Sequence, residues 1–384
     1  FGNESLRLNT SGQYNAAFGA NSLKANTTAS NNSALGYNAL SANTTGANNV
    51  AVGMNTADAN TTGSAITAVG AGALGANTTG GSNTALGNTA LAGNTTASNN
   101  TAVGTGSLFA NTTGDKNTSV GANSLDANTT GRLNTAMGQD ALGANTTADN
   151  NTAYGQASLK ANTTGTQNTG VGSSALFLNT TADNNTAVGF VALLSNTTGA
   201  SNTAVGSSSL QLNTTGTENV AVGASALVAN TTANQCTAVG FQALALNTTG
   251  IRNTAVGRKA LISNTTGTQN VAVGSAALFN NTASNNVAIG HDCMVSNTTG
   301  ANNTAVGSAS LDACTTGGSN TAVGREALGV LTTGNENTAM GLNAGIVLTT
   351  GSNNLLLGLA AGHSSSPSGN ITTDSNRVCL GNNS

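Results

Sequence analysis

Charged and aromatic side chains are scarce in this sequence. Of its 384 residues, 6% are charged and 3% are aromatic, tryptophan is absent and there is one proline. An ordinary globular domain is about 25% charged. An enzyme of this size needs charged and aromatic groups to build its site, so we predict no enzyme, and no catalytic residue, cofactor site or metal site. The net charge of −3 also offers no electrostatic basis for binding nucleic acid or anionic lipid.

Long hydrophobic runs are missing as well. No stretch approaches the roughly 20 apolar residues of a membrane-spanning helix, so we expect no membrane insertion. Disorder is also disfavoured, because 38% of the residues are hydrophobic and the net charge is small. The sequence therefore predicts an ordered chain without a thick globular core.

A repeat fills the chain. A glycine closes each Asn-Thr-Ala-Val-Gly unit and recurs in steps of 17 from Gly2 to Gly274. One step is shorter, to Gly290; steps of 17 resume to Gly358, and a step of 23 reaches Gly381. The consensus is Asn-Thr-Ala-Val-Gly-x-x-Ala-Leu-x-x-Asn-Thr-Thr-Gly-x-x. We number these positions 1 to 17, so that Asn202 is position 1 and Glu218 is position 17. Such self-similarity is typical of a solenoid.

The pattern inside one repeat predicts strands rather than a helix. Thr203 and Val205 alternate with Ala204 and Gly206, which places the two pairs on opposite faces of a strand. The segment 210–213 alternates again, so we expect a second short strand in each coil, separated from the first by Gly- and Asn-containing turns. The predicted fold is all-β: a parallel β-solenoid, or β-roll, of 17-residue coils.

Stacking must stabilise such coils, since one coil offers only about two large apolar side chains, such as Val205 and Leu210. We expect valine and leucine to form one face. The opposite strand face, with Ala204 and Gly206, permits close approach of a neighbour, so it is predicted to pack against partner chains around a threefold axis. The alternative is that alanine and glycine only fit a narrow interior within one chain.

Irregular repeats suggest a boundary near the C-terminus. Asn281-Thr282-Ala283 replaces Asn-Thr-Thr in the short coil, and Cys314, Leu331 and Leu348 replace the asparagine later on. The only proline lies in the loop 363–369. We therefore divide the chain into a solenoid shaft, residues 1–358, and an irregular coil or transition segment, residues 359–384.

Several motifs are better explained by the repeat than by chemistry. The segment 70–75 matches the dinucleotide-binding glycine pattern, but neither the helix nor the acidic residue that this motif requires is expected after it. His291 and His363 are isolated and are expected at the surface. The acids occupy no matching places on adjacent coils and are interpreted as dispersed solvated charges: Asp58, Asp115, Asp126, Asp140, Asp149, Asp183 and Glu218. The cysteines occupy four different repeat positions, which favours buried small hydrophobes over ligands or disulfides: Cys236, Cys293, Cys314 and Cys379.

The Asn-Thr-Thr triplet leaves two alternatives to a purely structural role. Each triplet, such as that beginning at Asn26, is formally an N-glycosylation sequon. We favour a turn ladder in which asparagine and threonine form hydrogen bonds. Repeated threonines also suggest ice binding as an alternative function. Adjacent residues such as Thr27 and Thr28 point to opposite sides of a strand, however, which weakens this hypothesis.

The repeat resembles those of bacteriophage tail-fibre proteins, notably of marine tailed phages. The C-terminal stretches 353–358 and 375–384 strengthen this resemblance, because in that family such a segment often precedes an intramolecular chaperone of the endosialidase type. The repeats are also similar to the heads of trimeric autotransporter adhesins, whose units are shorter.

The resemblance implies a homotrimeric fibre on a virion that carries host-surface attachment. Its partners would be copies of itself, a host cell-surface receptor or glycan, and other tail proteins. The alternatives are a trimeric adhesin on an extracellular cell surface and, further removed, an ice-binding solenoid. No receptor-binding residue is assigned from the sequence.

Overall fold

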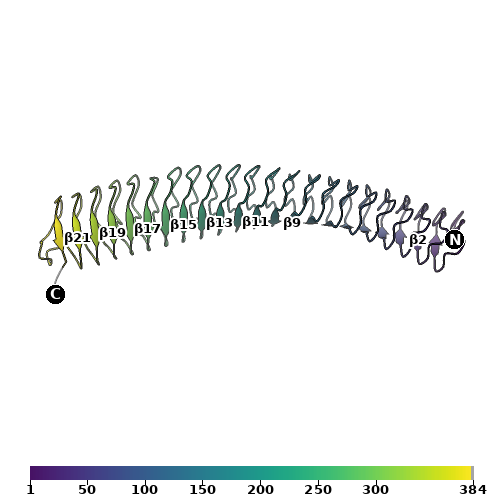
Figure 1. The fold of residues 1–384 in the computed structure, drawn as a ribbon, viewed down its shortest axis with the longest axis horizontal. Helices are drawn as coiled ribbons and strands as arrows, with labels where there is room; N and C mark the ends of the chain where they lie inside the picture. The colour runs from purple at the N-terminus through teal and green to yellow at the C-terminus, as the bar shows by residue number, and fades with distance from the viewer. Residues whose placement is uncertain (382–384) are drawn as a thin grey trace. The chain divides into compact units, whose positions relative to one another are not determined.

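The computed structural model describes residues 1–381 as two units, residues 1–198 and 199–381, which are treated separately below. Each unit is a parallel β-solenoid with coils of 17 residues, as the repeat predicts, and the described residues form no helix. In Figure 1 the strands of each unit lie side by side, one per coil, and the turns of the coil return on the other side.

Every strand is three residues long. The strands of the first unit are β1 (Ala16–Phe18), β2 (Ser33–Leu35), β3 (Val50–Val52), β4 (Thr67–Val69), β5 (Thr84–Leu86), β6 (Thr101–Val103), β7 (Thr118–Val120), β8 (Thr135–Met137), β9 (Thr152–Tyr154), β10 (Thr169–Val171) and β11 (Thr186–Val188). Those of the second are β12 (Thr203–Val205), β13 (Val220–Val222), β14 (Thr237–Val239), β15 (Thr254–Val256), β16 (Val271–Val273), β17 (Val287–Ile289), β18 (Thr304–Val306), β19 (Thr321–Val323), β20 (Thr338–Met340), β21 (Leu355–Leu357) and β22 (Val378–Leu380).

Within each unit, successive strands pair in parallel and in register. In β14 and β15, for example, Thr237 lies beside Thr254 and Val239 beside Val256. Equivalent side chains therefore form columns along the stack, because the repeat length equals the length of one coil. Since parallel neighbours also share hydrogen bonds, each coil is stabilised by the coils before and after it.

The predicted second strand is absent from the described coils. Positions 7 and 9 adopt left-handed backbone, as at Ser208 (φ 56°) and Leu210 (φ 49°). These turns bond neighbouring coils without extended conformation: the Leu210 N–H donates to the Ala226 carbonyl (3.0 Å). The alternation expected along 210–213 is therefore wrong as well, because Leu210 is buried whereas Leu212, two residues on, is exposed. Left-handed leucine is unfavourable, and its burial offsets that strain.

The glycine at position 5 is required by both conformation and space. Gly138 has φ +133°, and a Cβ atom built on it would lie 2.5 Å from the Gly155 carbonyl oxygen of the next coil. Real Cβ contacts do not come this close, and side chains disfavour this backbone region. The repeating glycine thus permits neighbouring coils to approach to hydrogen-bonding distance.

The interior contains the alanine column, which corrects the expected arrangement of faces. Ala204 and Leu210 are fully buried within the single coil, whereas Val205 is only partly buried. The prediction that the Ala204 face packs against partner chains is therefore wrong, and the alternative of a narrow interior is confirmed. Alternation shows that neighbours point to opposite sides, but the path of the turns decides which side encloses the core.

Buried asparagines form two ladders inside each unit. At position 1, the Asn117 N–H donates to the Asn100 side-chain oxygen (2.9 Å), and the Asn117 side-chain amide donates to the Gly131 carbonyl (2.8 Å). At position 12, the Asn111 amide donates to the Asn94 oxygen (2.9 Å) and the Gly114 carbonyl (3.0 Å). These side chains are fully buried, so each ladder replaces water with protein partners.

The irregular coils keep the strand register. Val271 of β16 pairs with Val287 of β17 although the intervening coil is one residue short. Leu355 of β21 pairs with Val378 of β22 across the 23-residue coil, and the Ile371 N–H donates to the Gly362 carbonyl (3.0 Å), which closes the inserted loop. The division at residue 358 stays a prediction.

Candidate interaction surface

The asparagine of each Asn-Thr-Thr triplet faces the interior rather than the solvent. Asn26 is fully buried and donates to the Asn9 side-chain oxygen (2.8 Å) and the Ala29 carbonyl (3.0 Å). A glycan on this nitrogen would have to leave both partners, so the folded coil supports the turn-ladder interpretation over glycosylation. The ladder contacts follow directly from the 17-residue register.

The two threonines of the triplet have different surroundings. The Thr27 hydroxyl donates to the Thr44 carbonyl of the next coil (3.1 Å), and equivalent bonds recur in other coils. Thr28 is exposed. Only one of the two columns therefore presents its hydroxyls freely to solvent, which fits the expectation that adjacent threonines do not form a common face.

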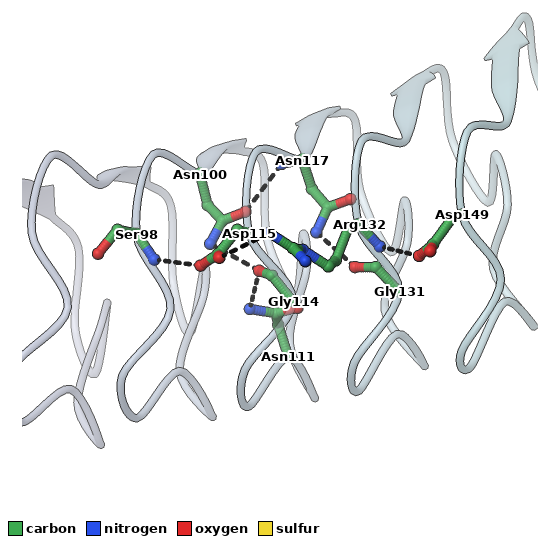
Figure 2. A network of polar contacts seen from close by, with 9 residues as sticks. All are labelled: Ser98, Asn100, Asn111, Gly114, Asp115, Asn117, Gly131, Arg132 and Asp149. Carbon is green, nitrogen blue, oxygen red and sulfur yellow. Dashed lines mark hydrogen bonds and ion pairs between the residues drawn. The ribbon is translucent and has the colours of Figure 1, made fainter.

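A line of polar contacts at position 16 was missed by sequence reasoning. Asp115 accepts a hydrogen bond from the Ser98 main-chain N–H (2.9 Å) and forms an ion pair with Arg132 (3.4 Å). Asp149 accepts from the Arg132 main-chain N–H (2.6 Å). Figure 2 shows these four residues in succession along the stack, beside Asn100 and Asn117. These acids join neighbouring coils and are more than dispersed charges.

Asp183 follows the same pattern, since it accepts from the Thr166 main-chain N–H (2.6 Å). The Asn234 side-chain oxygen likewise accepts a hydrogen bond from the Thr217 main-chain N–H (2.7 Å). The sequence signal was the recurrence of Asp, Asn or Ser at position 16, often on alternate coils. A search for carboxylates at matching places on adjacent coils could not detect it, because the acceptor bonds backbone.

Carboxylates at different repeat positions influence one another electrostatically. Burial is the largest cause that raises the pKa of Asp126, and Asp140 from the next coil raises it further. Burial likewise raises the pKa of Asp312, with a contribution from Asp292. Burial also raises the pKa of Asp58. Asp140 binds Lys160 (3.1 Å), so this region contains a mixed ion pair rather than an isolated acid pair.

The histidines and Glu218 make only local contacts and do not gather into a common site. His291 contacts the exposed carboxylate of Asp292 (3.0 Å), and the His363 Nδ1 atom lies 3.2 Å from the Ser365 hydroxyl within its own loop. Glu218 accepts from the Gln235 side-chain amide (3.0 Å). The segment 70–75 follows the end of β4 at Val69 and forms a turn, so no helix follows the glycine pattern.

All four cysteines are buried and free, as predicted from their different repeat positions. Burial raises the pKa of the Cys293 thiol to about 12 and that of Cys314 to about 11. Burial also raises the pKa of Cys236. The thiols of Cys236, Cys293 and Cys314 therefore remain protonated and weakly nucleophilic near neutral pH.

Among residues 1–381, no three His, Cys, Asp or Glu side chains gather as metal ligands would. The same residues contain no helix long and apolar enough to cross a membrane. The main surface feature is instead the outer strand face, which we define as the side chains of positions 2 and 4. Unlike the buried alanine column, this face lies on the outside of the coil.

No known family model matches the sequence, and no curated protein matches it either.

Proposed function

We propose that this chain is the structural and adhesive shaft of a bacteriophage tail fibre, a homotrimeric rod that carries host-surface attachment on the virion. The observation that supports this most is the in-register stacking of 17-residue coils within each unit. Each regular coil adds the same kind of inter-strand hydrogen bonds, and most coils also add asparagine hydrogen bonds. Such a repeat lengthens a protein without requiring a new core, which suits a spacer.

The surface chemistry is compatible with a mechanical role. Buried asparagines and alanines use the repeated positions, while positions 6, 10, 11 and 17 vary from coil to coil. Weak contacts of these variable side chains with a host receptor or glycan, repeated on three chains, would add through avidity. Other tail proteins would hold the ends of the shaft.

Antibodies against the purified chain would test this assignment by electron microscopy of the source culture, with cells and released particles examined together. We expect labelling on the tail fibres of particles, lost when the antibody is first absorbed with the chain. Labelling confined to the cell surface would overturn the phage assignment and favour a trimeric cellular adhesin.

A further inference from the structure

The outer strand face lacks charge throughout both units. Position 4 is apolar in every described strand, from Phe18 in β1 to Val188 in β11 and from Val205 in β12 to Leu380 in β22. Position 2 is most often threonine or valine and is never charged in these strands. Since charged residues do occur at other outward positions, the uncharged strip follows the strands rather than the overall composition.

This face is not required by the core of the single chain. The interior is already filled by the alanine, leucine and asparagine columns. Exposed apolar side chains on the outer strand face include Leu35 (53% exposed), Tyr154 (56%) and Met340 (48%). Burying such groups stabilises by about 25 cal/mol per Å² of apolar surface. Position 4 is exposed or partly exposed in every described coil, and such a continuous apolar column indicates a covered surface.

Charged groups flank the strip on both sides in the second unit and on one side in the first. Position 17 precedes the strand and includes Lys116, Glu218 and Arg252; position 6 follows it and includes Arg258 and Arg325. An uncharged centre with a polar rim is the usual anatomy of a protein–protein interface. At β1 to β3 the face also has an apolar depression of about 240 Å³, lined by Phe18, Ser33 and Leu35 among others.

The strip of each unit has the size of a small interface between chains. Each unit contributes eleven three-residue strands. At a strand spacing of about 4.8 Å and a rise of about 3.3 Å per residue, this gives a strip of roughly 50 by 10 Å per unit. Each strip therefore offers about 500 Å², which compares with the small protein–protein interfaces that bury less than about 600 Å² per partner.

We infer that the outer strand face is the surface through which copies of this chain associate. A second copy presents the same strand spacing, so its valine columns fit between those of the first without a change of register. It also presents no charge, and therefore leaves no unpaired ion in the contact. The inference rests on the proposed function for the trimeric state, and it adds the contact surface.

Native mass measurement at about 50 μM chain tests the surface with matched charge substitutions. One variant combines Val120→Glu, Val171→Glu and Val222→Glu on the outer strand face, three coils apart so that the new charges do not meet within a chain. The control combines Thr130→Glu, Thr181→Glu and Thr232→Glu, which are exposed on the same three coils. We expect three times the 37.1 kDa chain mass for wild type and control, and single chains for the face variant.

A face variant that keeps the wild-type mass would overturn this inference alone, while the trimeric shaft would stand. A monomeric wild type would overturn both this inference and the trimeric part of the proposed function, but not labelling of fibres by antibody. Circular dichroism shows whether the face variant retains its β-structure.

If the charged variant unfolds, single cysteines give an independent result. A thiol at Val222→Cys should react with a maleimide at least tenfold more slowly in the concentrated protein than at high dilution, because association covers it. Thr232→Cys should react equally at both concentrations. Equal behaviour of the two thiols would contradict the inferred contact.

Discussion

The units 1–198 and 199–381 use the same coil but differ in the continuity of the asparagine ladder at position 12. In the first unit, each described asparagine from Asn26 to Asn179 donates to the one before it, as Asn128 does to Asn111 (2.8 Å). In the second unit, the ladder is disturbed at Asn281 and then ends at Cys314. The fold tolerates both changes because the strands keep their register.

The disturbance leaves polar atoms without partners. In the short coil the Asn281 amide donates to the Ala283 carbonyl (2.9 Å) and no longer reaches Asn264, whose side-chain oxygen is buried and unbonded. The Asn297 oxygen is also buried and unbonded, since Cys314 stands where the next donor would be. An unsatisfied buried polar group costs about 1–3 kcal/mol. Strand pairing and ladder bonding are thus separable contributions.

The largest expected loss of stability comes from replacing the position-5 glycine, which both units contain. Gly138→Ala in the first unit and Gly257→Ala in the second should each destabilise by more than about 3 kcal/mol, because a Cβ at either site meets the backbone of the next coil at positive φ. Guanidinium unfolding measures the change. The control is Gly143→Ala, where the nearest atom to the new Cβ is 3.3 Å away. Similar losses for Gly138→Ala and Gly143→Ala would contradict the close stacking.

A smaller loss of stability is expected from replacing a position-12 asparagine, and it should differ between the intact ladder of the first unit and the interrupted ladder of the second. Asn111→Ala removes two donated bonds and the acceptor of Asn128, so we expect a loss of about 2–4 kcal/mol. Asn297→Ala removes the bonds donated to Asn281 and Gly300 only, and its loss should be smaller by about 1 kcal/mol. Thermal and guanidinium unfolding of both variants measure the difference. Equal losses would show that the ladder acceptor contributes nothing.

Repairing the ladder should stabilise the second unit modestly. Cys314→Asn offers a donor to the unbonded Asn297 oxygen but leaves its own oxygen unbonded beside Leu331, so we expect a gain of less than about 1 kcal/mol. The matched control is Leu331→Asn, which places an amide next to Leu348 and Cys314 in a buried column and should destabilise. Unfolding midpoints of the two variants are compared with wild type. A gain for Leu331→Asn would refute the ladder explanation.

The smallest effect concerns pH. Because burial raises the pKa of Asp58 above 3.8 in the folded chain, the folded state binds this proton more tightly than the unfolded state. Its contribution to stability is present below pH 3.8 and is lost as pH rises through the raised value. Asp58→Asn should therefore raise the Tm slightly at pH 7 relative to wild type. At pH 3 this advantage should disappear, and an equal advantage at both values would exclude the titration.

The coil length, the stacking and the glycine column were predictable, because a strict period constrains all three. The interior was not, since alternation at Ala204 and Val205 cannot distinguish the enclosed side from the outer one. The left-handed backbone at Leu210 was hidden too, because leucine gives no local signal for it. The contact of Asp115 with the preceding coil was also not predictable. Its partner is the main-chain N–H of Ser98, and a pattern of side chains gives no information about main-chain partners.

Disulfide trapping at exposed position 14 tests the stacking of 17-residue coils most directly. Thr113→Cys with Thr130→Cys places two thiols on adjacent coils, where Cα atoms about 4.8 Å apart permit a disulfide. Thr113→Cys with Thr147→Cys places them two coils apart, at about 10 Å, beyond the reach of this bond. Peptide mapping after mild oxidation of dilute protein should find the 113–130 bond and little of the 113–147 bond. Equal yields, or a preference for 113–147, would contradict the account.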